Sequence, residues 1–454
     1  MKLTMSQVAD VLHARKVTGD GDFTRISTDT RTLQSGDLFV ALVGPNFDGH
    51  EFIAQAQQKG AIGALVSEEI DTNLPLLLVA DTRIALAGIA RIRRQQMSGK
   101  WVAVTGSSGK TTVKEMLGHI FAQAGSVEVT QGNLNNDIGV PLTIWNMQAQ
   151  DVDYRVLELG ANHAGEIAYT CRIGLPEIAI LNNAQDAHLA GFGSQRGVVE
   201  TKGEIISSLA PDGQAVLNLD DVNFAYWAEL AGDRQIWSFS IENDAARVHT
   251  KNLQVNADAS DFVLSVDGQE CAASLPLSGR HNVANALAAA AAASAAGLSV
   301  AQISAGLANC QAYRGRLVRH ELANDVLVID DTYNANPASV RAAIDVLAQQ
   351  AGSRCLILGD LRELGDASRS LHSELGRYAA KAGINYFIGV GSRVAAAVSQ
   401  FAADGGEHPI AVASQDEVSP YLQTLPQQQL SCLVKGSRSS RMERVVELLL
   451  QKDQ

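Results

Sequence analysis

The chain has 454 residues, of which 46% are hydrophobic and 19% are charged, and its formal net charge is −13. This length exceeds what one hydrophobic core usually supports, so we expect two or three folded domains of a soluble protein and no extensive disorder. The negative charge argues against general nucleic-acid binding, because a phosphate backbone demands a basic surface.

The cysteines and the first residues favour a cytoplasmic protein. Five cysteines are widely scattered and form no CxxC pair, which predicts neither a disulfide framework nor a zinc site. The first residues, MKLTMSQVADVLHARK, show neither a basic segment before an apolar core nor a small-residue cleavage site, so no export signal is expected. The alanine-rich stretch 285–297 is too short and too weakly apolar to span a membrane, and it predicts a closely packed helix.

The order of predicted elements indicates an α/β fold with three domains. Residues 1–82 contain short apolar runs at 38–42, 62–66 and 74–80, separated by polar turns, which predicts a small N-terminal α/β domain. Residues 83–312 begin a new pattern with a buried strand at WVAVT, then a loop and a helix, and further strands at YRVLELG, EIAILNN and QAVLNL. This pattern predicts a central domain with a mostly parallel, doubly wound sheet.

A third series of strands starts near Tyr313. Its apolar runs are VLVIDD, CLILGD, YFIGVG and CLVKGS, and each ends at a polar or glycine-containing turn. We therefore expect residues 313–454 to form a C-terminal Rossmann-like domain. Ligands of such sheets collect at the carboxyl ends of the strands.

The strongest motif is TGSSGKTT at residues 105–112, between a predicted strand and a predicted helix. Glycines let backbone N–H groups surround phosphate oxygens, the helix N-terminus favours anions, Lys110 supplies a cation, and a threonine hydroxyl can ligate Mg²⁺. The strict GxxxxGK[ST] pattern is not met, because its first glycine would fall at Val104. A glycine turn before an exposed lysine is the alternative, and the strand–loop–helix setting favours a phosphate loop.

Three residues beyond this loop are candidates for metal binding and activation. Glu158 ends the strand YRVLELG, where its carboxylate could reach a Mg²⁺ held by phosphate and Thr111, although a helix cap or a surface charge is an equal alternative. His188 follows EIAILNN, and a lone histidine is more often structural. Lys202, in VETKGEI, would by itself be assigned to a solvated helix face.

Taken together, these segments resemble the Mur ligase family, and within it the type that adds D-alanyl-D-alanine. The resemblance rests on TGSSGKTT, TQGNLNNDIGVPLT, LELGANHAGEI, DAHLAGFGS, TKGEI, HNVANALAA, GRL, DDTYNANPAS, GDLRELG and VKGSRSSRME. The N-terminal segments STDTR and NFDGHEF are similar to the UDP-sugar site of the family. The resemblance runs through nearly the whole chain.

The resemblance implies roles for residues of the second and third domains. The ATP phosphates would be bound by Gly106, Ser107, Ser108, Gly109, Lys110, Thr111 and Thr112. The metal ligands for two Mg²⁺ ions would be Thr111, Glu158, His188 and Lys202, the last after carbamylation, because adding CO₂ turns an ammonium into a carboxylate. The other nucleotide contacts would be Asn285 to adenine, Arg316 to the γ-phosphate, Asp331 to ribose, and Tyr333 nearby.

The substrate residues are also implied by the resemblance. In the first domain, the uridine diphosphate region would contain Ser27, Thr30, Arg31, Asn46, Asp48 and His50. Arg31 could pair there with diphosphate oxygens. Sites for the sugar-peptide and the incoming dipeptide would involve Asn133, Asn135, Asn136, Asn334 and Asn336. Without the resemblance, such asparagines indicate turns only.

The implied activity is an ATP-dependent ligase in which Lys110, Glu158, His188, Lys202 and Arg316 take part in catalysis. It would join D-alanyl-D-alanine to UDP-N-acetylmuramoyl-tripeptide in peptidoglycan synthesis, acting as a cytoplasmic monomer without nucleic acid or membrane insertion. Three alternatives remain. They are an amide ligase adding a single amino acid or resembling folylpolyglutamate synthetase, a binding module that hydrolyses ATP slowly, and a dehydrogenase suggested by GVGSR at 389–393, which lacks the third glycine of that fingerprint.

Overall fold

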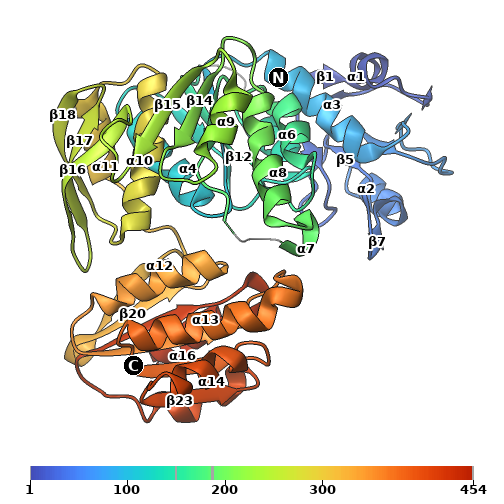
Figure 1. Ribbon diagram of the computed structural model, residues 1–454. Coiled ribbons are helices and arrows are strands. Elements are labelled where there is room, and N and C mark those ends of the chain that lie inside the picture. Colours follow the sequence, from blue (N-terminus) through green and yellow to red (C-terminus); the bar gives the residue numbers. More distant parts are fainter. Residues whose placement is uncertain (1, 149–150, 186–188, 452–454) are drawn as a thin grey trace.

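The computed structural model describes residues 2–148, 151–185 and 189–451. Three large sheets follow one another along the sequence, each with its own helices, so the predicted α/β class is confirmed. Figure 1 shows an N-terminal body in blue, a central body from cyan to yellow, and a C-terminal body in orange and red. We use these three names for the parts built around the three sheets.

The N-terminal body contains a five-stranded sheet with the order β2-β9-β8-β5-β4, parallel except for β2. Its strands are β2 (Lys16–Val17), β4 (Ile26–Ser27), β5 (Leu38–Val40), β8 (Gly63–Val66) and β9 (Leu76–Leu78). Two ribbons and two helices complete it: β1 (Leu3–Thr4) with β3 (Asp22–Phe23), β6 (Val43–Gly44) with β7 (Phe47–Asp48), α1 (Met5–Leu12) and α2 (Ile53–Gln58). The three predicted apolar runs are β5, β8 and β9, of which β5 and β8 are wholly buried, as parallel strands covered on both faces are.

The central body contains a nine-stranded sheet with the order β11-β12-β10-β13-β14-β15-β16-β17-β18. The strands are β10 (Lys100–Thr105), β11 (Val127–Val129), β12 (Tyr154–Glu158), β13 (Ile178–Leu181), β14 (Gln214–Asn218), β15 (Gln235–Ser240), β16 (Val248–Val255), β17 (Ser260–Val266) and β18 (Gln269–Leu275). Neighbours from β11 to β16 are parallel, which confirms the expectation, whereas β16, β17 and β18 form an antiparallel meander that the sequence analysis did not predict.

Helices cover both faces of this sheet. One face carries α4 (Lys110–Phe121), α10 (Arg280–Ala295) and α11 (Val300–Ala308). The other carries α5 (Gly139–Asn146), α6 (Glu166–Gly174), α8 (Gln195–Ser207) and α9 (Phe224–Ala231), while α7 (Leu189–Phe192) precedes α8. The alanine-rich stretch forms most of α10 and is buried up to Ala293, which confirms the predicted packed helix. Its small side chains let α10 lie close to α4 and β15.

The C-terminal body contains a six-stranded sheet with the order β19-β20-β24-β21-β22-β23, in which only β19 is antiparallel to its neighbour. The strands are β19 (Val318–Leu322), β20 (Val326–Asp331), β21 (Ser353–Gly359), β22 (Tyr386–Val390), β23 (His408–Val412) and β24 (Leu430–Lys435). The helices are α12 (Pro337–Ala348), α13 (Ser368–Lys381), α14 (Ala395–Ala403), α15 (Ser419–Leu422) and α16 (Glu443–Gln451). The four predicted strands are β20, β21, β22 and β24.

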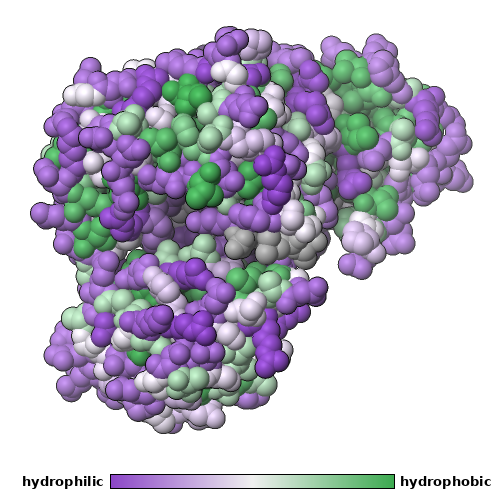
Figure 2. Space-filling model, in the orientation of Figure 1, coloured by the Kyte–Doolittle hydropathy of each residue, from purple (hydrophilic) through white to green (hydrophobic). Residues whose placement is uncertain are grey.

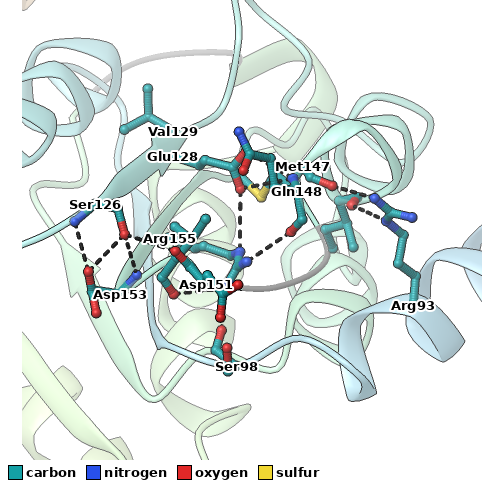
Figure 3. Close-up of polar contacts among 12 residues, drawn as sticks. Arg93, Ser98, Ser126, Glu128, Val129, Met147, Gln148, Asp151, Asp153 and Arg155 are labelled. Carbon is teal, nitrogen blue, oxygen red and sulfur yellow. Dashed lines mark hydrogen bonds and ion pairs between the residues drawn. The ribbon is translucent and has the colours of Figure 1, made fainter. Parts of the chain in front are cut away.

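The N-terminal and central bodies are joined by α3 (Thr82–Gln95). Arg93 of α3 donates hydrogen bonds to the carbonyls of Ile144 and Met147 at the end of α5, and Figure 3 shows the bond to Met147. Its guanidinium lies 4.9 Å from the ring centre of Trp145, and that ring stacks on Phe23 of the N-terminal body at 5.7 Å. Because α3 packs on both bodies, the position of a domain boundary near residue 82 stays a prediction.

The edge strand β11 is held to its neighbour β12 by polar side-chain contacts (Figure 3). The Arg155 side chain of β12 is fully buried, donates to the Gln148 carbonyl at 2.9 Å, and lies 3.5 Å from the Glu128 carboxylate of β11. The Glu128 carboxylate also accepts the Gln148 N–H at 2.9 Å. These contacts connect β11 and β12 to the segment that follows α5.

The C-terminal body is reached through residues 309–317, and hydrogen bonds to Ser108 and Ala257 hold it against the central body. The Asn336 side-chain amide donates to the Ser108 hydroxyl at 2.9 Å. The side chains of Arg319 and Gln350 both donate to the Ala257 carbonyl at 3.0 Å. Figure 1 shows α12 as the helix of this body that lies nearest the central body.

The visible face of the molecule is mostly polar, and the cysteines are free. On the face shown in Figure 2, hydrophilic residues predominate and hydrophobic ones occur in small scattered groups. Four of the five cysteines are buried. Within the described parts of the chain, no helix has both the length and the apolar character needed to cross a membrane.

Candidate active site

The phosphate loop lies between β10 and α4, as predicted. Gly109 has a φ of 81°, and a Cβ added to it would lie 2.2 Å from the Asn285 side-chain oxygen and 2.4 Å from the Asn182 side-chain nitrogen. Both the backbone conformation and the space therefore require glycine. This close approach brings α10 to the start of α4.

Two asparagines at the end of β13 hold this loop. The Asn183 side chain accepts the Ser108 N–H at 2.9 Å, and the Asn182 amide donates to the Ser108 carbonyl at 3.0 Å and to the Asn285 side chain at 2.9 Å. Neither residue was among the predicted site residues. The sequence feature that could have identified them is their position directly after an apolar strand, since ligands collect at the carboxyl ends of such strands.

Lys110 begins α4 and points back to the loop. Its ammonium donates to the Gly106 carbonyl at 2.7 Å. Desolvation lowers the pKa of Lys110, the Glu158 carboxylate opposes this shift, and the Arg316 guanidinium adds to it. The Lys110 ammonium at the phosphate loop is thus influenced by Glu158 of β12 and by Arg316 of the segment before the C-terminal body.

Glu158 ends β12, and its side chain is buried. One carboxylate oxygen accepts the Asn135 amide at 2.7 Å, while the other, Oε2, is buried without a hydrogen-bond partner among the described residues. A buried carboxylate oxygen without a partner is unfavourable unless a cation or donor satisfies it. Together with the Thr111 hydroxyl at the start of α4, this oxygen suits a hard cation such as Mg²⁺.

Lys202 lies in α8 and is only 2% exposed, so it is not the solvated lysine that its sequence context suggested. The pKa of its amine is lowered to about 7, mainly by desolvation and also by the positive charge of Lys110, while Glu166 and Glu204 oppose the shift. Glu204 itself accepts backbone N–H groups at the start of α6, at 2.7 and 2.9 Å. A buried lysine whose pKa is near 7 is partly uncharged at physiological pH, and its neutral amine is reactive.

The segment that leads to the C-terminal body, and the ends of its strands β20 and β24, also contribute side chains. The Arg316 guanidinium lies 4.3 Å from the ring centre of Tyr333. The Asp331 carboxylate accepts the buried Lys435 ammonium at 2.6 Å, and that ammonium also donates to the Asn334 carbonyl at 2.9 Å. Lys435 was not predicted as a site residue, although it ends the strand CLVKGS.

These groups surround one cleft of about 1420 Å³ between the central and C-terminal bodies. The predicted residues that line it are Ser107, Ser108, Gly109, Lys110, Thr111, Thr112, Asn133, Asn135, Asn136, Glu158, Asn285, Arg316, Asp331, Tyr333, Asn334 and Asn336. Lys202 is not among the residues that line the cleft, but it lies close enough to Lys110 for that positive charge to lower its pKa. His188 lies outside the described residues, so its predicted role as a ligand is a prediction still.

The predicted uridine diphosphate residues lie apart from this cleft, in the N-terminal body. Thr30 is buried and donates to Gln55 at 2.7 Å, and the exposed Arg31 pairs with its neighbour Asp29 at 2.6 Å. His50 is buried with Asp48 on one ring nitrogen, at 2.6 Å, and the Ser67 N–H on the other.

The remaining two candidates differ in exposure. The Ser27 side chain is buried and donates to a backbone carbonyl of its own turn, whereas Asn46 is exposed. The roles of all six residues in nucleotide-sugar binding stay predictions.

Family models match three consecutive parts of the chain. They describe the Mur ligase family catalytic domain at residues 22–100, the Mur ligase middle domain at residues 104–293, and the Mur ligase glutamate ligase domain at residues 315–438. The chain belongs to the Mur ligase family. The resemblance inferred from the motifs is thereby confirmed.

Relatives of this Mur ligase match it from end to end. The UDP-N-acetylmuramoyl-tripeptide–D-alanyl-D-alanine ligase of Escherichia coli K12 is 44% identical over 451 residues, which are 99% of this chain and 98% of that protein. A crystal structure of MurF from Acinetobacter baumannii matches with a TM-score of 0.93 and 39% identity, covering 99% of each chain. The MurF ligase of Thermotoga maritima in complex with ADP matches with a TM-score of 0.84 and 28% identity, over 94% of this chain and 97% of that one.

Proposed function

We propose that this Mur ligase joins D-alanyl-D-alanine to the terminal carboxylate of UDP-N-acetylmuramoyl-tripeptide, converting ATP to ADP and phosphate, as a step of peptidoglycan precursor synthesis. The observation that carries the proposal is the end-to-end likeness to a ligase of that name at 44% identity. The cleft supports it, because it brings a phosphate loop, a buried carboxylate and cationic side chains from two bodies together. A module that only binds ATP has no need of a desolvated lysine beside Lys110.

In the first step the peptide carboxylate attacks the γ-phosphorus of ATP, the bond to the β,γ-bridging oxygen breaks, and an acyl phosphate and ADP result. Lys110 and Arg316 lie where they can neutralise the charge on the transferred phosphoryl group. The backbone N–H groups of the phosphate loop hold the nucleotide phosphates, and the Asn182–Asn183 contacts keep this loop in shape.

Two Mg²⁺ ions are part of this proposal. Thr111, Glu158, carbamylated Lys202 and His188 would hold them, and the partnerless Oε2 of Glu158 supports the fit. Bound Mg²⁺ supplies electrostatic neutralisation of the phosphate oxygens. Lys202 would become a ligand when its neutral amine adds to CO₂ and releases a proton, giving an N-carboxylate in place of the ammonium. Its burial and its pKa of about 7 favour this reaction, because only the neutral amine is nucleophilic.

In the second step the dipeptide amine attacks the acyl carbonyl, and phosphate leaves. The C-terminal edge of the six-stranded sheet can hold the dipeptide carboxylate, since it presents cations at three strand ends: Arg362 after β21, Arg393 after β22, and Lys435 with Arg438 at the end of β24. Lys435 pairs with Asp331 and Arg438 with Glu443. No carboxylate among the described residues pairs with Arg362 or Arg393, so these two are the cations best placed to accept a new anion.

The loops that carry these arginines are fixed to one another. The Asp360 carboxylate accepts the N–H groups of Arg393 and Val394 at 2.9 Å, and the Ser437 hydroxyl accepts the Arg362 N–H at 2.9 Å. The Ser440 hydroxyl donates to the Asp360 carbonyl at 2.9 Å. An anion site built on these strand ends is therefore preorganised.

Arg393→Ala is expected to raise the KM for D-alanyl-D-alanine about tenfold, with little change in the KM for ATP, because one charged hydrogen bond to the dipeptide is lost. Steady-state kinetics with each substrate varied in turn measures this. Arg377→Ala is the matched control, since Arg377 pairs with Asp404 on the same body and does not line the cleft. Equal KM values for the dipeptide in Arg393→Ala and the wild type would exclude this residue from the subsite.

The function itself is tested by phosphate release from ATP with purified UDP-N-acetylmuramoyl-tripeptide, with and without D-alanyl-D-alanine, combined with mass analysis of the product. We expect release that requires the tripeptide, and a product that contains both the tripeptide and the dipeptide. Replacing the dipeptide by single amino acids distinguishes the other amide ligases, which would use them. Release that ignores both acceptors would instead favour a nucleotide-hydrolysing binding module.

A further inference from the structure

Lys114 is a buried cation for which the proposed reaction has no direct use. It lies one helical turn after Lys110 in α4, and its side chain is 1% exposed. Its ammonium donates to the backbone carbonyl of Thr130 at 2.8 Å and pairs with the Glu115 carboxylate at 2.8 Å. A charge so far removed from water requires fixed partners, so this contact defines where Thr130 lies relative to the phosphate-loop helix.

Thr130 in turn fixes the end of β12. It follows the edge strand β11 and is fully buried. Its backbone N–H donates to the Val156 carbonyl at 2.9 Å, and its hydroxyl accepts the backbone N–H of Glu158 at 3.0 Å. The β11–β12 ladder ends at Val129 and Val156, so the hydroxyl of Thr130 replaces the next backbone acceptor. The residue that donates to this hydroxyl is Glu158, whose Oε2 lacks a hydrogen-bond partner among the described residues.

The same ammonium also contacts the segment that leads to the C-terminal body. It lies 5.4 Å from the ring centre of Tyr313, and the Tyr313 carbonyl accepts the Arg316 N–H at 2.8 Å. Lys114 therefore touches the start of the segment that carries Arg316. One buried cation connects the phosphate-loop helix, the strand end with Glu158, and the segment with the γ-phosphate arginine.

We propose that Lys114 and Thr130 are positioning residues that set the Glu158 carboxylate for a divalent cation on the nucleotide, through the Lys114 ammonium, the Thr130 carbonyl and the Thr130 hydroxyl. This inference rests on the proposed function for the identity of the nucleotide and the cation. Neither residue touches substrate. Their effect is on the coupling between Mg²⁺ and nucleotide, and not on nucleotide binding alone.

Thr130→Val and Thr130→Ser form a matched pair that tests this route. Valine keeps the shape and the backbone carbonyl but removes the hydroxyl acceptor, whereas serine keeps the acceptor. Calorimetric titration of each variant with ADP, in Mg²⁺ and in EDTA, measures how strongly the metal favours nucleotide binding. We expect the Mg²⁺ enhancement of ADP affinity to fall about tenfold in Thr130→Val and to be retained in Thr130→Ser, with ADP affinity in EDTA equal to wild type in both.

Lys114→Met is the second variant, and it covers the case in which Thr130→Val does not fold. It is expected to lower the same Mg²⁺ enhancement, and the double variant Lys114→Met/Thr130→Val is expected to lose no more than the larger single loss, because both act on one route. Arg94→Met is the control for general destabilisation, since Arg94 donates to the Gly174 and Leu175 carbonyls at the far end of α6.

Two results would overturn the proposal. One is a wild-type Mg²⁺ enhancement in folded Thr130→Val or Lys114→Met, and the other is a loss of ADP affinity that is the same in EDTA and in Mg²⁺. The ligase assay on the unaltered chain tests the proposed function separately, because the ADP titrations require neither peptide substrate.

Discussion

Lys202→Ala is expected to lower turnover by about 10²–10³-fold, and added short carboxylic acids such as acetate are expected to restore part of it. Removing one preorganised charge from a phosphoryl-transfer site has effects of this size. The alanine leaves space where the carbamate would lie, and a small carboxylate can enter it. Phosphate release in the presence of the tripeptide and the dipeptide, over a series of acid concentrations, measures both effects.

Lys100→Ala is the matched control, because Lys100 begins β10, at the end of this strand opposite to the phosphate loop, and pairs with Glu177 at 2.7 Å. Its turnover should equal that of the wild type. Near-normal activity of Lys202→Ala without additives would refute the carbamate role. A spectrum recorded with labelled CO₂ tests the carbamate independently of activity. The signal of the carbamate carbon should be present in the wild-type enzyme and absent in Lys202→Ala.

The pH dependence of the carbamate has a definite sign. The pKa of Lys202 is lowered to about 7, from 10.5 for a free lysine. Below pH 7 the ammonium predominates and cannot react with CO₂, whereas above pH 7 the neutral amine can. At constant dissolved CO₂ the carbamate signal is therefore expected to rise as the pH passes from 6 to 8.

Lys110→Met is expected to lower kcat by about 10³-fold without loss of folding stability. The ammonium is needed where charge develops on the transferred phosphoryl group, which explains the loss of activity. Its pKa is lowered mainly by desolvation, so the folded state disfavours the charge. An apolar side chain of similar length removes that cost. Chemical denaturation and ATP turnover, measured on the same preparation, separate the two effects.

Lys110→Arg serves as the companion variant. It keeps the charge but replaces a compact ammonium by a planar guanidinium, so we expect turnover well below wild type at this closely packed loop. Wild-type turnover in Lys110→Met would contradict the assignment of the phosphate loop. A large loss of stability in Lys110→Met would contradict the argument from desolvation.

Most of the fold could be predicted because its strands are continuous apolar runs that end at polar turns. The runs at VLVIDD and CLVKGS became the adjacent parallel strands β20 and β24. The meander from Val248 to Leu275 was missed for a physical reason. Its first strand, VHTKNLQV, is polar and half exposed, so it carries no apolar run, and its pairing with β17 depends on tertiary context.

The candidate site divides in the same way. The phosphate loop could be predicted because its glycines, lysine and threonine are consecutive, and Glu158 because it ends an apolar strand. The burial of Lys202 could not, since its helix sequence resembles any solvated helix and only the packing of α8 removes the amine from water. Asn182 and Arg393 were missed because their significance depends on which strand ends become neighbours.

The connection of the N-terminal and central bodies through α3 has a consequence for the length of the substrate. The N-terminal body is packed against the central body through Arg93, Trp145 and Phe23. The C-terminal body, in contrast, contacts the central body through hydrogen bonds such as that from Asn336 to Ser108. In the proposed function, a substrate held by its uridine nucleotide in the N-terminal body would have to span the distance from that body to the phosphate loop. We therefore expect a precursor one residue shorter to bind through its nucleotide but to hold its terminal carboxylate out of reach of ATP.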